Sequence, residues 1–286
     1  MARLLVTGAD GQIATDLVAR CAKEGDDVLA ARRSMLDVTD RDAVLGMITS
    51  WRPDIVVNCA AWTAVDACEG DPRRAFTVNA VAARWIVEGC ARAGAHLVQV
   101  STDYVFDGEQ AAPYREWDHP RPQSVYGATK LDGEHEALAL GVQAAVVRTS
   151  WVCGRHGSNM VKTVIRLANE RDDLAFVDDQ VGHPTFTADL APLLRRIAVD
   201  RRSGVIHATN QGETSWHGFA RAVVAAMGKD PAMVRPIATA DLQPPRPAKR
   251  PANSRLDNAV LRAAGLPLLR DFHEPLEETV RALVAE

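Results

Sequence analysis

Short apolar runs alternate along the chain with segments in which apolar residues recur every three or four positions. Several short runs are apolar throughout, which is typical of parallel strands buried on both faces. We therefore expect an α/β fold with a doubly wound parallel sheet. In the first part of the chain the expected strands are Arg3–Thr7, Asp27–Ala31, Ile55–Asn58, His96–Ser101 and Ala144–Thr149, and the expected helices are Gln12–Lys23, Arg41–Ser50, Arg73–Gly94 and Tyr126–Leu140.

The alternation continues after Trp151, so we expect residues 1–150 to form the main domain, with some later segments returning to it. Residues 151–286 then form mainly a smaller, substrate-binding part. A proline-rich basic loop at residues 242–251 precedes the last helix. The later expected elements are the helices Met160–Asn169, Thr187–Asp200, Ser215–Met227 and Glu274–Val284 and the strands Leu174–Val177 and Val205–His207.

Gly8 and Gly11 lie at the turn from the first expected strand into the first expected helix, and the small residue Ala14 follows. Glycines there let the backbone approach a pyrophosphate, and the helix N-terminus supplies N–H groups and a favourable dipole. Two glycines alone often only permit a turn. Their position after the first strand favours a Rossmann-type dinucleotide-binding domain.

The end of the second expected strand lacks the acidic residue that binds a free ribose diol in many such domains. Ala30 and Ala31 stand there, followed by Arg32 and Arg33. Guanidinium groups match a 2′-phosphate, so we expect NADPH as the cofactor, with NADH possible. The alternative is that the two arginines are a solvated surface pair.

Tyr126 and Lys130 are four residues apart and share one face of an expected helix. An ammonium group beside a phenol favours the phenolate and lowers its pKa, which would make Tyr126 a general acid. Thr102, at the end of an expected strand, would place a hydroxyl nearby and bind a substrate carbonyl. Taken alone, the tyrosine and lysine could equally be an ordinary amphipathic pair.

Composition narrows the class of protein further. The net charge of −4 argues against a nucleic-acid partner. The five cysteines are scattered without metal or disulfide spacing, and neither a signal peptide nor a membrane-spanning segment is evident, so we expect a cytoplasmic protein. The histidines likewise show no metal spacing, and we assign no metal site.

Several longer motifs resemble the extended short-chain dehydrogenase/reductases, and within them most closely the dTDP-4-dehydrorhamnose reductase family. The resemblance covers nearly the whole chain. The glycine loop and the Tyr-x-x-x-Lys pair are shared by the whole superfamily, whereas the motifs at 101–108 and 178–185 are long and specific. The matching segments are 8–13, 58–66, 78–80, 101–108, 126–130, 148–151, 177–185, 214–217 and 250–257.

The resemblance implies roles for individual residues. Tyr126 would protonate the C4 oxygen of a dTDP-linked 4-keto-6-deoxyhexose while NADPH delivers hydride to C4, with Thr102 on the same oxygen. Lys130 would lower the tyrosine pKa and hold the nicotinamide ribose. The implied cofactor contacts are Gly8, Gly11, Gln12, Ile13, Asp37, Val38, Ala60, Ala61 and Trp62, and the implied substrate contacts are Asp103, Trp151, Asn253 and Arg255, the last two within a lid at 253–257.

Two alternatives remain open. A nucleotide-sugar epimerase or dehydratase would share the fold, although dehydratases usually carry a Glu after the aspartate at the position of Asp103, and Tyr104 stands there instead. A regulatory subunit similar to methionine adenosyltransferase β would bind NADP without catalysis. Magnesium dependence, the nucleotide base and the oligomeric state stay open, with a homodimer as the candidate assembly.

Overall fold

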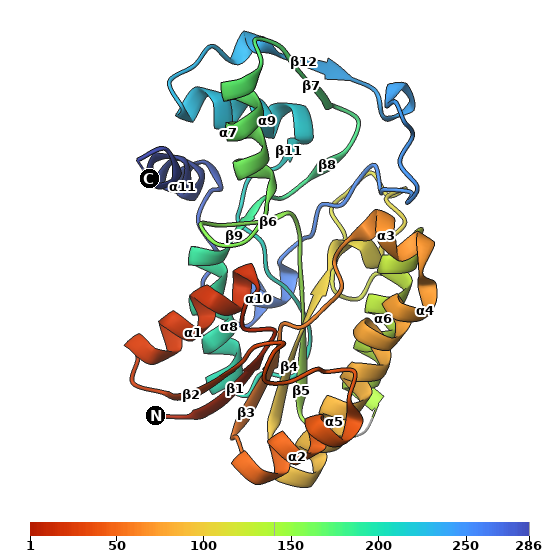
Figure 1. Ribbon diagram of the computed structural model, residues 1–286, viewed down its shortest axis with the longest axis vertical. Coiled ribbons are helices and arrows are strands. Elements are labelled where there is room, and N and C mark those ends of the chain that lie inside the picture. Colours follow the sequence, from red (N-terminus) through yellow and green to blue (C-terminus); the bar gives the residue numbers. More distant parts are fainter. Residues whose placement is uncertain (140, 286) are drawn as a thin grey trace.

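A six-stranded sheet, ordered β10-β5-β4-β3-β1-β2 with all neighbouring strands parallel, forms the centre of the larger part of the molecule (Figure 1). The computed structural model describes residues 1–139 and 141–285. The strand order reverses between β1 and β3, and ligands of such sheets bind beyond the carboxyl ends of the strands at this point. The strands are β1 (Arg3–Thr7), β2 (Asp27–Ala31), β3 (Ile55–Asn58), β4 (His96–Thr102), β5 (Ala144–Thr149) and β10 (Gly204–His207).

Helices cover both faces of the sheet, which confirms the doubly wound fold (Figure 1). On one face, α1 (Gln12–Lys23) and α8 (Thr187–Val199) bury apolar side chains such as Leu17 and Leu190. The other face is covered by α2 (Arg41–Trp51), α5 (Ala82–Ala93) and α6 (Val125–Ala139). Leu140, the expected end of α6, lies outside the described residues. Burial on both faces explains why the strand sequences are apolar throughout.

The segment expected as a single helix, Arg73–Gly94, contains a π-helical turn. It consists of α4 (Pro72–Phe76), the π turn Thr77–Val81 and α5. Such turns are frequent at functional sites. Here the turn carries Asn79, whose side chain accepts a hydrogen bond from Trp62 N at 2.8 Å and donates to Trp62 O at 3.2 Å and to Thr129 Oγ1 at 3.1 Å. Asn79 therefore ties the loop after β3 to α6.

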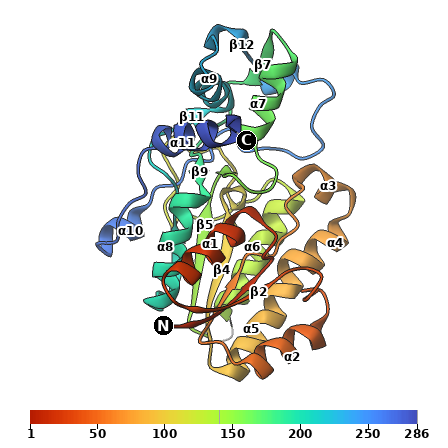
Figure 2. The same ribbon diagram turned by 60° about the vertical axis from the view of Figure 1, so that its left-hand side comes forward.

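The smaller part packs around its own apolar cluster, which includes Phe219 and Phe272 (Figure 2). Its helices are α7 (Met160–Glu170), α9 (Trp216–Ala226) and α11 (His273–Val284), and β7 (Leu174–Val177) pairs with β12 (Val234–Ile237). The sequence did not predict β12 or the short elements α3 (Val65–Gly70), β6 (Val152–Cys153), β8 (Val181–Gly182), β9 (Thr185–Phe186), β11 (Thr214–Ser215) and α10 (Ala259–Ala263).

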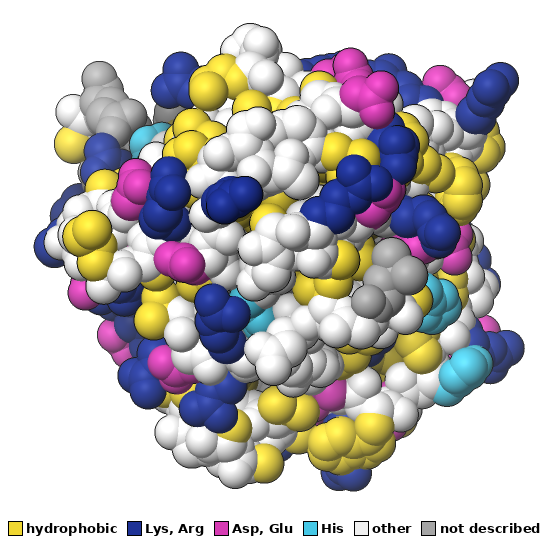
Figure 3. All heavy atoms as spheres, turned by 90° about the horizontal axis from the view of Figure 1, so that it is seen from below, with side chains coloured by type: hydrophobic (Ala, Val, Ile, Leu, Met, Phe, Trp, Pro, Cys, Tyr) yellow, Lys and Arg dark blue, Asp and Glu magenta, His cyan; other side chains and the backbone are white. Residues whose placement is uncertain are grey.

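The surface is mixed in charge. On the face shown in Figure 3, Lys and Arg side chains are scattered among acidic and apolar ones and do not gather in one patch. None of the helices in the described residues is both long enough and apolar enough to cross a bilayer.

Candidate active site

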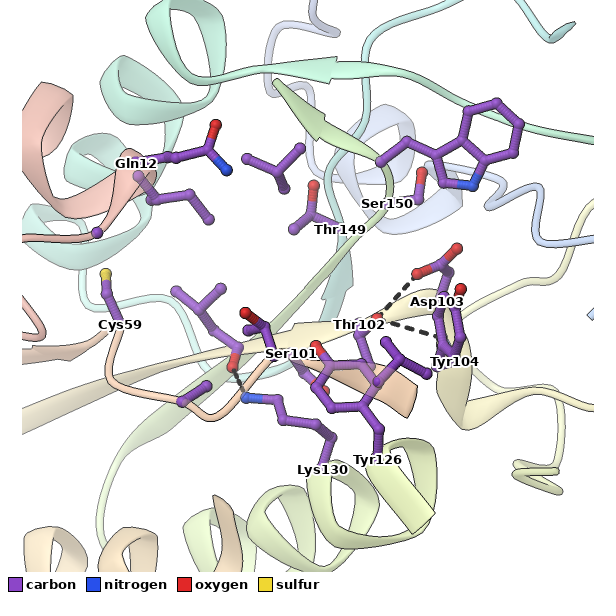
Figure 4. A pocket seen from close by; sticks show the side chains of 18 of the residues that line it. Gln12, Cys59, Ser101, Thr102, Asp103, Tyr104, Tyr126, Lys130, Thr149 and Ser150 are labelled. Carbon is purple, nitrogen blue, oxygen red and sulfur yellow. Dashed lines mark hydrogen bonds between the residues drawn. The ribbon is translucent and has the colours of Figure 1, made fainter. Parts of the chain in front are cut away.

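Two adjoining cavities lie beyond the carboxyl ends of the strands. The first has a volume of about 390 Å³ and brings together Thr102, Asp103, Tyr126, Lys130 and Trp151 (Figure 4). The second, of about 330 Å³, shares part of its wall with the first. Of the expected cofactor contacts, Gln12 and Ile13 line the first cavity, Gly11 and Ala61 line both, and Gly8, Arg33, Asp37, Val38, Ala60 and Trp62 line the second.

The glycine loop between the cavities has the form that a dinucleotide requires. Gly8 has φ +64°, and a Cβ there would lie only 2.8 Å from the backbone of Ala60. Gly11 precedes the first residue of α1, so the N–H groups at the start of that helix point outward at the cavities. A larger residue at Gly8 would push the loop after β3 away. The loop therefore fits a pyrophosphate lying against bare backbone.

Tyr126 lies near the start of α6, and its side chain lines the first cavity together with Thr102 at the end of β4. Its ring packs edge-on against Tyr104, with the ring centroids 5.5 Å apart. Burial raises the pKa of Tyr126, and the neighbouring Thr102 opposes this only in part. The phenol is therefore protonated at neutral pH, the state that a proton donor needs.

Lys130 lies one turn further along α6 and is buried beside the tyrosine (Figure 4). Its Nζ donates a hydrogen bond of 2.7 Å to Val100 O, and burial lowers the pKa of its ammonium to about 8, against the opposing charge of Glu134. The expectation that Lys130 lowers the pKa of Tyr126 is not met in the protein alone, because the effect of burial on the phenol prevails. The ammonium instead faces the backbone of β4.

Asp103 is a further titratable group in the first cavity. Its Oδ1 accepts a hydrogen bond of 2.8 Å from Thr102 Oγ1, and burial raises the pKa of the carboxyl to about 6 although this hydrogen bond opposes the shift. Thr102 thus contacts Asp103 in the cavity that also holds Tyr126. A carboxyl with this pKa changes charge close to neutrality, so its state affects any ligand in the cavity.

Trp151 also lines the first cavity. Its backbone adopts φ +44°, which is rare for a bulky residue and indicates a functional constraint. The indole stacks on Trp216, with ring centroids 3.6 Å apart and planes 6° from parallel. Trp216 also lines the cavity and was missed as a site residue, although it lies in the segment 214–217 that carries part of the family resemblance.

Three expected site residues do not line either cavity. Arg32 pairs with Asp10 at 3.5 Å, and both side chains are more than half exposed. Asn253 donates to the carbonyl oxygens of Gln110 and Ala112, and Arg255 forms an ion pair with Glu213 at 2.9 Å. In this structure Asn253 and Arg255 anchor neighbouring loops, and their contact with substrate stays a prediction.

Sequence reasoning also missed Cys59, Tyr104 and Arg74, which line the cavities. Tyr104 follows the predicted residue Asp103 directly, and Cys59 precedes Ala60, so both could have been inferred from their neighbours. No sequence pattern around Arg74 indicated a role in the site, because only the fold brings α4 to the second cavity. Within the described part of the chain, no group of three or more His, Cys, Asp or Glu residues is arranged to hold a metal ion.

Comparison with known proteins assigns the family. The model of the RmlD substrate binding domain family matches residues 2–285. The chain belongs to this family. It is 44% identical to the dTDP-4-dehydrorhamnose reductase of Streptomyces griseus, over 98% of this chain and 94% of that protein.

Two further relatives bear on substrate and cofactor. The chain is 44% identical to a probable dTDP-4,6-dihydroxy-2-methyloxan-3-one 4-ketoreductase of Streptomyces antibioticus, over 99% of this chain and 96% of that protein. It also superimposes on the crystal structure of dTDP-4-dehydrorhamnose reductase from Bacillus anthracis in complex with NADP, with a TM-score of 0.94, 34% identity and coverage of 98% and 99%.

Proposed function

We propose that this protein reduces the C4 ketone of dTDP-4-dehydro-L-rhamnose to dTDP-L-rhamnose, with NADPH as the reductant. The observation that carries the proposal is that Thr102, Tyr126 and Lys130 line one cavity, which adjoins the glycine-loop cavity. The names of relatives that cover nearly all of the chain support the same activity.

Individual residues of the chain have separate roles in the proposed reaction. Thr102 binds the C4 carbonyl oxygen, and Tyr126 donates its proton to that oxygen as the ketone becomes an alcohol. When bound, NADPH supplies the hydride that adds to C4. Gly8, Gly11, Gln12 and Ile13 would hold the pyrophosphate, Asp37 and Val38 would flank the adenine, and Ala60, Ala61 and Trp62 would line the cofactor along its length.

The substrate would lie between Tyr126 and the paired indoles of Trp151 and Trp216. In this proposal Asp103 contacts the sugar, and residues 151–286 supply most of the substrate-binding part, including Asn253 and Arg255. We also propose a cytoplasmic location and a homodimer.

Product analysis tests the activity. The protein is incubated with NADPH and dTDP-4-dehydro-L-rhamnose, and the sugar is identified by NMR. We expect one dTDP-L-rhamnose to form for each NADPH that is oxidised. An epimerised but unreduced sugar would overturn the reductase assignment in favour of an epimerase. The 4-keto sugar implied by the Streptomyces antibioticus relative serves as a competing substrate, and faster reduction of it would change the substrate but not the reaction.

A binding measurement separates the enzyme from a regulatory subunit that only holds NADP. Trp151→Ala removes half of the indole stack, so we expect it to cost about 1–3 kcal/mol of dTDP affinity and to leave NADPH affinity nearly unchanged. Calorimetry with dTDP at saturating NADP⁺ measures this. Trp117→Ala is the matched control, because Trp117 is 65% exposed and lies outside the cavity lining. A wild-type protein that binds NADP⁺ tightly but not dTDP would contradict the enzymatic proposal.

A further inference from the structure

Two guanidinium groups from separate segments line the second cavity. Arg33 follows β2, and Arg74 lies on α4, about forty residues further along the chain. Both share the cavity with Asp37, Val38 and Thr39. A pocket at the end of the second strand is where the adenosine ribose of a dinucleotide lies in such domains. Two arginines there give it the charge to bind a phosphate.

Arg74 is held in place by its surroundings. Its guanidinium lies over the ring of Trp62, with Cζ 4.4 Å from the ring centroid. Its backbone N–H donates at 3.0 Å to Asp71, the N-cap of α4, which fixes the first turn of the helix. Trp62 is in turn fixed by Asn79 through both of its backbone groups. The ring and the helix end therefore position the guanidinium before any ligand arrives.

No carboxylate neutralises the charge of Arg74, since none of the described residues forms an ion pair with it. The other arginine of the pair after β2 differs. Arg32 is bound to Asp10 and does not line the cavity. Arg33 shares the cavity with a carboxylate, that of Asp37, whose pKa is lowered chiefly by hydrogen bonds from Thr39 and further by the charge of Arg33. Neither cavity arginine forms an ion pair with a described residue, and Arg33 differs from Arg74 in lying near the Asp37 carboxylate.

We propose that Arg74 determines the preference for NADPH by binding the adenosine 2′-phosphate together with Arg33, with Trp62 supporting its guanidinium. Arg32 has no part in this contact. The inference rests on the proposed use of NADPH and adds to it the residue that selects the phosphorylated cofactor. The two guanidinium groups can donate directional, charge-assisted hydrogen bonds to the oxygens of a 2′-phosphate, and a cofactor with a free ribose lacks these charged oxygens.

The test measures nucleotide binding and needs no turnover. Calorimetry compares NADPH with NADH, and adenosine 2′,5′-bisphosphate with 5′-AMP, on wild-type protein and on Arg74→Gln, which keeps most of the side chain and removes the charge. We expect Arg74→Gln to weaken NADPH and the bisphosphate by roughly 10-fold to 100-fold, and NADH and 5′-AMP by less than about 2-fold.

The neighbouring arginine supplies the control. Arg73 lies on the same helix and does not line the cavity, so Arg73→Gln should leave all four affinities unchanged. Trp62→Leu should weaken the phosphorylated ligands selectively, by less than Arg74→Gln does. Equal losses for both ligands of each pair would overturn the inference, because they would mean that Arg74 stacks on adenine. Unchanged NADPH affinity in Arg74→Gln would also overturn it.

Failure of this inference is distinct from failure of the proposed function. Reduction of the 4-keto sugar by wild-type protein, together with normal NADPH binding by Arg74→Gln, would reject the role of Arg74 and leave the reaction in place. Absence of NADPH binding by the wild-type protein would reject both.

Discussion

Tyr126→Phe is expected to lower turnover with the dTDP-4-keto sugar by roughly 10²-fold to 10⁴-fold, the usual contribution of a positioned general acid. The substitution removes only the hydroxyl from the cavity that Tyr126 shares with Thr102, and it leaves the ring packed against Tyr104. NADPH and dTDP affinities should change little, because the loss belongs to the proton-transfer step. Steady-state kinetics and calorimetry on the same protein check both statements.

Tyr104→Phe is the matched control for this experiment. Tyr104 lies in the same cavity wall, and Tyr104→Phe likewise removes one phenolic hydroxyl. Its contact with Thr102 is made by the backbone N–H, which the substitution leaves in place. We expect less than about a 10-fold loss of turnover, well below the 10²-fold minimum for a general acid. Near-normal turnover in Tyr126→Phe would show that another acid acts. Asp103 would then be the candidate, and activity would fall as the pH rises through its pKa of about 6.

The central sheet could be predicted almost to the residue because its strands carry their own signal. Four of the first five expected strands match the observed bounds, and β4 runs one residue further, to Thr102. Strands buried on both faces must be apolar throughout, and turns bound them sharply. The short strand β12 lacked this signal, since Arg235 and Pro236 lie exposed within it and only its pairing with β7 defines it.

The site was predictable where chemistry depends on local spacing. Tyr126 and Lys130 are one helical turn apart, and Thr102 ends a neighbouring strand, so the fold class alone brings them together. Arg74 and Trp216 depend on where distant segments pack, and no local pattern encodes that. The roles of these residues remain predictions until the variants are measured.

A buried ion pair beneath the active site is expected to have the largest effect on stability. Arg148, at the end of β5, contacts Glu134 on α6 through two nitrogens, the shortest distance being 2.7 Å, and the two side chains are only 4% and 2% exposed. Ser101 also donates to Glu134. Burial and the charge of Arg148 lower the pKa of His207 to about 3, so its neutral ring lies beside the guanidinium without competing for Glu134.

We expect Arg148→Met to lower the free energy of unfolding by about 3–5 kcal/mol, because it leaves the Glu134 carboxylate buried without its counter-charge. Arg84→Met is the matched control. Arg84, on α5, pairs at 3.1 Å with Glu136, which lies on α6 as Glu134 does. The Arg84 side chain is 57% exposed, and exposed pairs of this kind contribute about 1 kcal/mol or less to the free energy of unfolding. Denaturant titrations compare the two variants with the wild-type protein.

A double variant separates loss of the pair from loss of packing. Glu134→Met combined with Arg148→Met removes both charges and keeps apolar volume, so its stability should lie closer to that of the wild-type protein than Arg148→Met alone does. A double variant no more stable than the single one would show that shape, not the unpaired charge, dominates. Since Glu134 lies one turn from Lys130 and opposes the lowering of the lysine pKa, the double variant should also lower the pH at which the Lys130 ammonium loses its proton below about 8.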